Sequence, residues 1–487
     1  MSKRPNILWF TSDQQRWDTI HALGNEMIDT PNLDRLVQRG MAFTNTYCQN
    51  PICTPSRSSF MTGRYPSAIN ANINGAVNTP EHCELISKRL ADTGYYCGLV
   101  GKLHIASAWD DFEPRMDDGF DYFKYHLASG HFLNSDHNPY KEWLQAQGVD
   151  WHDIFMIDDK HDYHWYREDA PIELRQTAWL AQEAVDFMKE HKEDEQPWML
   201  CVNCFDPHPP YDAPKSLVDK YLERDLPMPV YSDEDVEADK KLKGFFFQSA
   251  VHAPDEKMRR NIASYYGMVE IIDHHLGKIL DALEELQLAD NTIVIYNSDH
   301  GEMLGDHGLT HKGCRFYEGI THVPLIISLP GTFQENVVCE DIIELTDIVP
   351  TILDICGLEQ TNVHGRSLLP ALKGEELKPR RFVRTEYYDT LEFDPCYDGL
   401  REPGEMDIKI DDDLCSYADM YFDGRYKLNV YHGTQFGQLF DMKEDPKEQN
   451  NLWDDPAYQE IKLKLLLDSY EAAVKYSRPG QVRRGRY

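Results

Sequence analysis

The sequence predicts a large α/β domain, with a mixed, mostly parallel sheet flanked by helices, followed by a smaller α+β domain. Short apolar runs alternate along the chain with segments whose apolar residues recur at helical spacing. This alternation is typical of parallel sheets covered by helices. The chain has 487 residues, which exceeds one ordinary domain of ~100–200 residues. Hydrophobic residues make up 41% and charged residues 27%, as in folded globular proteins.

Four short apolar runs are expected to form strands, because continuous apolar runs of this length are typical of strands buried on both faces of a sheet. They cover residues 6–10, 198–205, 292–296 and 323–329. Asp follows each of the first three runs within three residues. In open α/β sheets the functional site lies beyond the carboxyl ends of the strands, so we expect it at this edge.

Helices are expected at about residues 32–39 and at residues 175–191 and 262–288, where the latter two show helical spacing of apolar residues. Residues 106–169 differ, because they are rich in His, Asp, Trp and Tyr and have no clear period. We interpret them as an insertion near the site. A plain surface excursion is the alternative that the sequence leaves open.

The character of the chain changes after about residue 374. Residues 426–430 and 438–441 look like two strands joined by a short turn, and residues 458–476 look like a helix. The chain is therefore divided into two predicted domains, a catalytic α/β domain of residues 1–374 and a smaller domain of residues 375–487 with an antiparallel sheet, a helix and a basic tail.

The chain is strongly acidic, with 49 Lys and Arg residues against 83 Asp and Glu residues and a net charge of −34. Such a surface repels nucleic acid and anionic membranes, so neither is an expected partner. It also repels an anionic substrate at long range. An anionic substrate would therefore need a locally positive pocket.

The sequence also bounds the compartment. No run approaches the ~20 apolar residues of a membrane span, and no apolar core of a signal peptide precedes the first strand. The eleven cysteines are odd in number and irregularly spaced, which favours a reducing compartment over a disulfide framework. We expect a cytoplasmic protein, or a periplasmic one if a leader has been removed.

The most specific feature is the string C-T-P-S-R-S-S-F-M-T-G-R, which begins at Cys53. A lone Cys is usually a small buried hydrophobe, but the whole string resembles the signature of the type I, formylglycine-dependent sulfatases of the alkaline phosphatase superfamily. The resemblance implies an alkaline-phosphatase-like fold and a sulfuric ester hydrolase. It also implies that a formylglycine-generating or anaerobic maturation enzyme oxidises Cys53 to formylglycine.

Formylglycine suits sulfate esters for a chemical reason. A hydrated aldehyde carries two hydroxyls on one carbon, so one hydroxyl attacks sulfur and the other expels sulfate as the aldehyde re-forms. A serine would leave a stable sulfated enzyme. The nucleophile at Cys53 thus brings its own route of release.

The resemblance also implies a site for one divalent metal ion, and the residue made from Cys53 is among its expected ligands. Asp13 and Gln14 follow the first strand, and Asp299 and His300 follow the third, where the family places its ligands. The family more often has Asp and Asn in place of Gln14 and His300. Oxygen ligands favour Ca²⁺ or Mg²⁺, and an imidazole ligand keeps Mn²⁺ open. Ca²⁺ is the expected ion.

Positive and titratable side chains complete the expected site. Lys102 and His104 match the family's G-K-x-H element, in which the Lys binds sulfate and the His removes a proton during sulfate release. His208 matches an H-x-P element and would contact the ester oxygen, as a candidate general acid. Lys312 matches a second sulfate-binding Lys, and Arg57 would pair with formylglycine and the ligand carboxylates. These cations would stabilise an anionic transition state.

Two other functions stay open. Asp13-Gln14 with Asp299-His300 also resembles a branch that uses the same formylglycine on phosphonate monoesters or phosphodiesters. That branch has neutral hydroxyl residues where this sequence has Lys102 and His104, which favours the sulfatase. The second alternative is a catalytically silent protein that binds sulfated glycans, and it requires Cys53 to stay unconverted.

The expected substrate is a small sulfated molecule, by analogy a sugar, and an aryl or alkyl sulfate remains open. The position of the sulfate is not encoded in these motifs. The basic tail, residues 478–487, favours packing against a neighbouring subunit, so a homo-oligomer is also expected.

Overall fold

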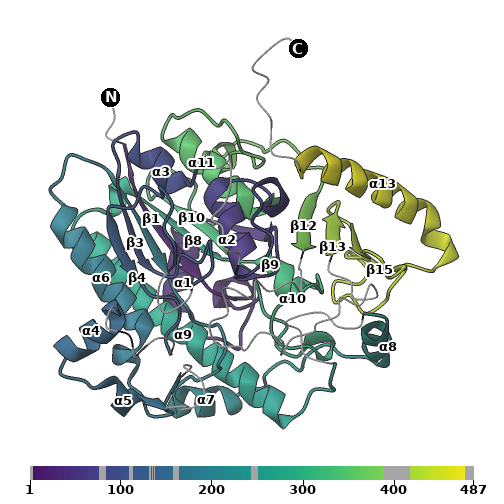
Figure 1. Cartoon of the computed structure of the whole chain (residues 1–487), viewed down its shortest axis with the longest axis horizontal. Coiled ribbons are helices and arrows are strands. Elements are labelled where there is room, and N and C mark those ends of the chain that lie inside the picture. The colour runs from purple at the N-terminus through teal and green to yellow at the C-terminus, as the bar shows by residue number, and fades with distance from the viewer. Residues whose placement is uncertain are drawn as a thin grey trace, which may run out of the picture.

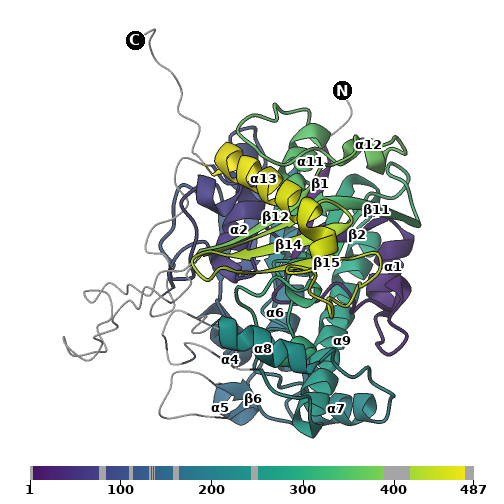
Figure 2. The ribbon, with the colours of Figure 1, turned by 90° about the vertical axis from the view of Figure 1, so that its right-hand side faces the viewer.

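The structure is a computed structural model whose described residues form sheets of nine, four and two strands, with helices on both faces of the largest one (Figures 1 and 2). It describes residues 4–75, 84–108, 113–130, 133, 135, 138–156, 164–242, 251–388 and 417–477. Among these residues, none of the helices combines the length and the apolar character that a membrane span requires.

The larger sheet has nine strands in the order β11-β2-β10-β8-β1-β7-β3-β4, and β9 pairs with β2 beside this path. The strands β8, β1, β7, β3 and β4 at its centre and one edge are all parallel. The predicted mixed and mostly parallel sheet is thus confirmed. The strands are β1 (Asn6–Ser12), β2 (Met41–Tyr47), β3 (Tyr96–Gly101), β4 (Tyr122–Tyr125), β7 (Trp198–Asn203), β8 (Thr292–Ser298), β9 (His322–Val323), β10 (Leu325–Ser328) and β11 (Val337–Glu344).

β1 shows why the apolar runs form the centre of this sheet. All its residues are buried, and its side chains alternate between two hydrophobic cores. Leu8 and Phe10 belong to one core and Ile7 and Trp9 to the other, because successive side chains of a strand point to opposite faces. Full burial of a side chain of this size contributes about 1.5–3 kcal/mol.

Helices close both cores. The core around Leu8 is covered by α1 (Pro31–Gln38), α6 (Gln176–His191) and the long α9 (Glu256–Glu285). The core around Trp9 is covered by α2 (Cys53–Thr62), α3 (Ile86–Ala91), α11 (Ile348–Ile355) and α12 (Leu369–Leu372). The helices expected from the sequence near residues 32–39, 175–191 and 262–288 are all present (Figure 1).

The fourth expected strand differs from the prediction. Residues 323–329 divide into β9 and β10 at Pro324, which has no N–H to donate to a ladder. β10 runs antiparallel to both β8 and β2. An apolar run reads the same in either direction, so the sequence could not show this reversal.

β4 corrects the interpretation of residues 106–169 as wholly an insertion. It pairs in parallel with β3 at the edge of the large sheet. Its side chains are only half buried, so it lacks the continuous apolar run that identified the other strands. Parts of this segment lie outside the described residues, and its position near the site stays a prediction.

Other elements that precede the smaller sheet are α4 (Pro139–Ala146), α5 (Trp151–Ile154), β5 (Phe155–Met156), β6 (Trp165–Tyr166), α7 (Lys215–Leu222), α8 (Asp233–Lys241) and α10 (Glu318–Thr321).

The smaller sheet is antiparallel, with the order β12-β13-β14-β15. Its elements are β12 (Val383–Tyr388), β13 (Tyr417–Phe422), β14 (Tyr426–Tyr431), β15 (Phe436–Asp441) and the helix α13 (Gln459–Tyr476). Leu465 and Ala472 of α13 pack on Leu428 and Leu439 of the sheet. The two strands and the helix expected there are present. The domain boundary near residue 374 stays a prediction, and the basic tail lies outside the described residues.

A buried histidine of α9 makes this fold sensitive to acid. Burial and the nearby Lys278 lower the pKa of His275 from 6.5 to about 3, and its Nε2 lies 3.0 Å from the carbonyl oxygen of Ile172. The unfolded chain therefore takes up a proton between these pKa values that the folded chain does not. This contribution to stability is fully present above pH 6.5 and is lost as the pH falls toward 3.

We expect His275→Gln to make the melting temperature fall less steeply with acid below pH 6.5. Glutamine can still donate to the Ile172 carbonyl but takes up no proton. Melting curves at several pH values measure this, with the exposed His152→Gln as the control. If the melting temperatures of His275→Gln and the wild type fell equally steeply below pH 6.5, His275 would not be the cause of the acid sensitivity.

Candidate active site

Parallel strands bring the expected site residues to one edge of the large sheet. Ser12 of β1 stands in register with Ser298 of β8, so Asp13 and Asp299 leave neighbouring strands side by side. On the other side of β1, β7 leads to His208 and β3 leads to Lys102. This is the edge beyond the carboxyl ends, where the sequence predicted the site.

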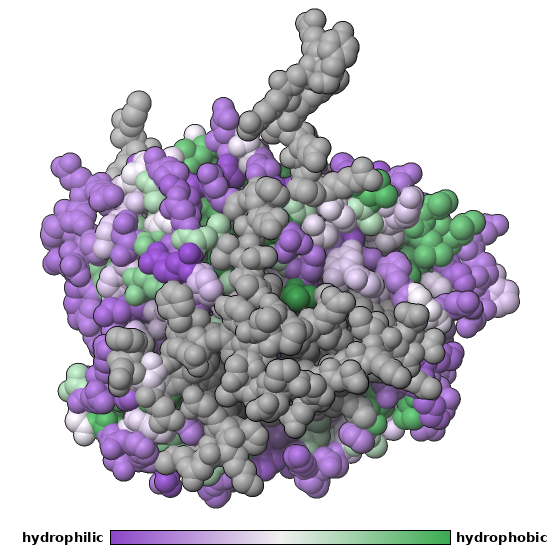
Figure 3. Space-filling view, viewed as in Figure 1, coloured by the Kyte–Doolittle hydropathy of each residue, from purple (hydrophilic) through white to green (hydrophobic). Residues whose placement is uncertain are grey.

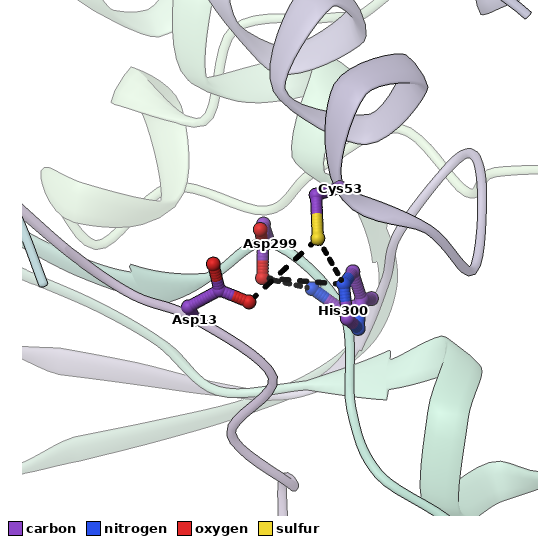
Figure 4. Close-up of side chains that lie close together, drawn as sticks. All are labelled: Asp13, Cys53, Asp299 and His300. Atoms are coloured by element: carbon purple, nitrogen blue, oxygen red, sulfur yellow. Dashed lines mark hydrogen bonds and ion pairs between the residues drawn. The ribbon is translucent and has the colours of Figure 1, made fainter. Parts of the chain in front are cut away.

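Four buried side chains form a cluster that could hold a metal ion (Figure 4). The ligand atoms of Asp13, Cys53, Asp299 and His300 all lie within 4.8 Å of one another. The Cys53 Sγ is 3.2 Å from the His300 Nε2 and 3.8 Å from an Asp13 carboxylate oxygen. Cys53 is the first residue of α2, directly after the extended Ile52, so the start of the helix presents the thiol to the sheet edge.

Gln14 supplies an independent test of whether these residues fit a metal. Its side-chain oxygen is buried and has no hydrogen-bond partner. The amide nitrogen of the same side chain donates to Glu302, and its backbone N–H donates to Asp299 at 3.0 Å. A buried oxygen without a partner is costly unless it receives a donor or a cation. The donor set of two carboxylates, an amide oxygen and an imidazole fits a divalent cation.

Three buried cations surround this cluster. The Lys102 Nζ lies 2.5 Å from an Asp13 carboxylate oxygen, and the Arg57 Nε lies 2.8 Å from an Asp299 carboxylate oxygen. The Lys312 Nζ lies 2.8 Å from the Cys53 Sγ. The cations that an anionic substrate would require in this acidic chain therefore lie beside the cluster.

These cations control the ionisation of the cluster. Burial alone would raise the pKa of Asp13, but Lys102, Arg57 and Lys312 outweigh burial and hold this pKa well below its usual range. Burial and Asp13 raise the pKa of Cys53, yet Lys102, Lys312 and His300 lower it to about 7. A thiol with this pKa is substantially thiolate near neutral pH, which is its reactive form.

The two expected histidines are held as neutral bases. Burial, followed by neighbouring lysines, lowers the pKa of both His104 and His208 well below 6.5. The His208 Nδ1–H donates a hydrogen bond to the Pro209 carbonyl oxygen at 2.6 Å, so the Nε2 lone pair faces the Lys312 Nζ at 2.8 Å. The buried Nδ1 of His104 has no hydrogen-bond partner.

The structure also shows two carboxylates that the sequence motifs did not identify. Glu302 accepts hydrogen bonds from the Gln14 side chain and from the backbone N–H groups of Leu304 and His311. It thus ties the Gln14 side chain to the segment that carries Lys312. Its place two residues after His300 was the available signal. Glu113 similarly accepts from the backbone N–H groups of residues 104–106, and burial raises its pKa to about 7.

We expect Glu302→Gln to weaken divalent metal binding by about 10- to 100-fold, the range typical of groups that orient metal ligands. Glutamine keeps the size of Glu302 but lacks its carboxylate. The Glu302 carboxylate accepts from the Gln14 amide nitrogen and thereby fixes which way the Gln14 side-chain oxygen points. Equilibrium dialysis of the metal and the metal-induced rise in melting temperature measure the effect. Glu340→Gln, at an exposed position, is the control, and unchanged metal affinity in Glu302→Gln would contradict the assignment.

Fold and site together define an α/β protein with a candidate site for a metal ion at the carboxyl edge of its large sheet. The family model described as Sulfatase matches residues 5–358, and the chain belongs to the sulfatase family. The predicted family and the predicted enzyme class, a sulfuric ester hydrolase, are thereby confirmed.

Two curated relatives agree with this assignment, and a solved structure shares the fold. An arylsulfatase of Clostridium perfringens is 29% identical over 480 residues, which cover 94% of this chain and 92% of the relative. An N-acetylglucosamine-6-O-sulfatase of Bacteroides thetaiotaomicron is 25% identical over 546 residues, covering 99% and 88%. The phosphonate monoester hydrolase of Agrobacterium radiobacter shares the fold, with a TM-score of 0.78, 24% identity and coverage of 97% and 96%.

Proposed function

We propose that this sulfatase hydrolyses a sulfate ester on a carbohydrate through a formylglycine made from Cys53. The observation that carries the proposal is the place of Cys53. Its Sγ lies 3.2 Å from the His300 Nε2 in the candidate metal cluster and 2.8 Å from the Lys312 Nζ. A nucleophile at this position attacks an anion that is already held by cations.

Formylglycine, as its hydrate, supplies one hydroxyl to attack sulfur and a second to release sulfate. The residues around it have separate tasks. Lys102 and Lys312 bind sulfate oxygens, and Arg57 holds the ligand carboxylates Asp13 and Asp299 in place at 3.4 Å and 2.8 Å. Because all three cations are buried and fixed before substrate arrives, little reorganisation is needed in the transition state.

Proton transfer is assigned to the two histidines. His104 is neutral because burial and Lys102 lower its pKa, so it can accept the proton of the second hydroxyl as sulfate leaves. The His208 Nε2 accepts a hydrogen bond from the Lys312 ammonium. As the alcohol departs, Lys312 passes this proton to the His208 Nε2, and the imidazolium that forms protonates the leaving oxygen as general acid. Lys312 is left as a neutral amine and regains a proton from solvent.

The proposed metal ion is Ca²⁺, held by Asp13, Gln14, Asp299 and His300, with Mn²⁺ or Mg²⁺ as alternatives. A bound divalent cation supplies a lowered pKa for the attacking hydroxyl and neutralises charge on the ester. Metal-free protein titrated with each ion in turn identifies the preferred one. The oxygen ligands favour Ca²⁺. A preference for Mn²⁺ would show that the imidazole of His300 determines the choice of metal.

A carbohydrate substrate is supported by the relative named as an N-acetylglucosamine-6-O-sulfatase. The test compares kcat/KM for sulfated monosaccharides, an aryl sulfate and a phosphonate monoester on the same preparation. The proposal predicts the highest kcat/KM for a sulfated sugar. A preference for the phosphonate monoester would favour the phosphonate and phosphodiester hydrolase, and binding without turnover would favour a silent glycan binder.

We further propose that conversion of Cys53 depends on a formylglycine-generating or anaerobic maturation enzyme, and that the protein works in the cytoplasm. The odd number of cysteines, eleven, supports a reducing compartment, and the periplasm is the alternative. Cell fractionation distinguishes the two compartments. Expression with and without a maturation enzyme tests the partner, since activity should require it.

A further inference from the structure

The outer face of α13 carries a row of exposed apolar side chains. Leu463, Leu467, Tyr470 and Val474 are exposed by 60%, 59%, 69% and 47%. They supply half of the large exposed hydrophobic side chains among the described residues. Hydrophobic side chains gather at the right of the molecule, where α13 lies (Figure 3). Single exposed apolar residues are ordinary, but a contiguous row on one helix indicates an interaction surface.

This row is not used by the fold of its own subunit. α13 turns Leu465, Ser469 and Ala472 inward, and these residues are buried. The helix crosses the outside of the molecule with its other face directed away from the small sheet (Figure 2). The helix is therefore apolar on two faces, and the described part of the chain covers only one of them.

The spacing of the row fits a second helix of the same kind. Steps of four, three and four residues from Leu463 to Val474 are those of a coiled-coil seam. In an antiparallel pair of two copies of α13, Leu463 faces Val474 and Leu467 faces Tyr470 of the second copy. The seam is thus complementary to itself, as a two-fold symmetric interface requires.

Charges beside the row select this antiparallel arrangement. Lys464 and Glu471 flank the row on one side, at equivalent heptad positions. Antiparallel pairing sets Lys464 of each copy against Glu471 of the other, whereas parallel pairing sets both against uncharged residues. Lys464 also lies 2.9 Å from Asp468 of its own helix, but it is 70% exposed, and such exposed pairs contribute little.

We propose that two copies of this chain associate through antiparallel α13 helices to form a symmetric homodimer. The proposal is independent of the proposed substrate and nucleophile. One helix face is smaller than the ~800 Å² that each partner buries in a standard interface. The dimer is therefore weak and dissociates on dilution.

Sedimentation velocity of the full chain over a dilution series tests the proposal. The wild type should change from dimer to monomer as it is diluted. Leu467→Glu should raise the dissociation constant by about 100-fold or more, because it buries an unpaired charge in the seam. Met228→Glu is the matched control, since Met228 is exposed by 59% but lies outside α13, and it should leave the dissociation constant unchanged.

Charge reversal tests the orientation. Lys464→Glu and Glu471→Lys should each raise the dissociation constant by about three- to tenfold, and the double variant should restore it. Failure of the double variant to restore association would overturn the antiparallel geometry. A wild type that stays monomeric at every concentration would overturn the dimer. If removal of residues 478–487 then produced dimers, the chain's own tail would be the occupant of this face.

Discussion

Replacing Cys53 with serine is expected to lower steady-state kcat for sulfate ester hydrolysis by about 10³-fold or more. Serine retains a hydroxyl that can attack sulfur but has no second hydroxyl on the same carbon. The sulfated enzyme therefore has no internal route of release. The expected signature is one equivalent of alcohol released per enzyme, followed by almost no further turnover.

Cys48→Ser is the matched control for this experiment. Cys48 is also buried and lies five residues before Cys53, but its sulfur faces the Ile320 carbonyl oxygen at 3.8 Å instead of the metal cluster. It should keep the turnover of the wild type. Continued turnover of Cys53→Ser at the wild-type rate would show that Cys53 is not the nucleophile's source.

Replacing Lys312 with methionine is expected to lower kcat/KM by about 10²- to 10³-fold, the usual cost of removing one fixed donor from an anionic transition state. The Lys312 Nζ contacts both the Cys53 Sγ and the His208 Nε2 at 2.8 Å. In the proposed mechanism, its loss removes a sulfate-binding charge and the source of the proton that reaches the leaving oxygen. Methionine preserves most of the length and the apolar packing of the side chain.

The same variant makes a second prediction that a purely structural role would not produce. Burial is the largest cause of the low pKa of His208, and Lys312 lowers it further. Lys312→Met should therefore raise the pKa of His208, which NMR titration of the imidazole measures. Lys443→Met, at an exposed position away from the cluster, is the control. An unchanged His208 titration together with full activity would contradict the role of Lys312.

The central strands of the fold, and the site residues that follow them, could be predicted from the sequence alone. β1 and β8 are buried on both faces, so their apolar runs are continuous, and the acidic residues after them mark the edge where both strands end. Position along parallel strands thus converts directly into proximity in space. The same reasoning explains why residues far apart in the sequence could be assigned to one site. The backbone N–H of Gln14 donates to Asp299, which lies 285 residues further along the chain.

Other features depend on contacts that leave no local pattern. Glu302 and Glu113 accept hydrogen bonds from backbone N–H groups. Nearly every residue has a backbone N–H, so these contacts leave no pattern in the sequence. The direction of β10 depends on its neighbours β8 and β2 and not on its own composition. The half-buried β4 lacks a continuous apolar face. Each of these features is determined by tertiary packing, which periodicity does not report.

The most direct test is the mass of the peptide that contains Cys53, isolated from protein produced together with a maturation enzyme. Replacement of CH₂SH by CHO lowers the mass by about 18 Da. We predict this loss, together with sulfatase activity that rises in proportion to the converted fraction. Sulfatase activity at full strength from protein in which Cys53 remains an unmodified thiol would contradict the formylglycine mechanism.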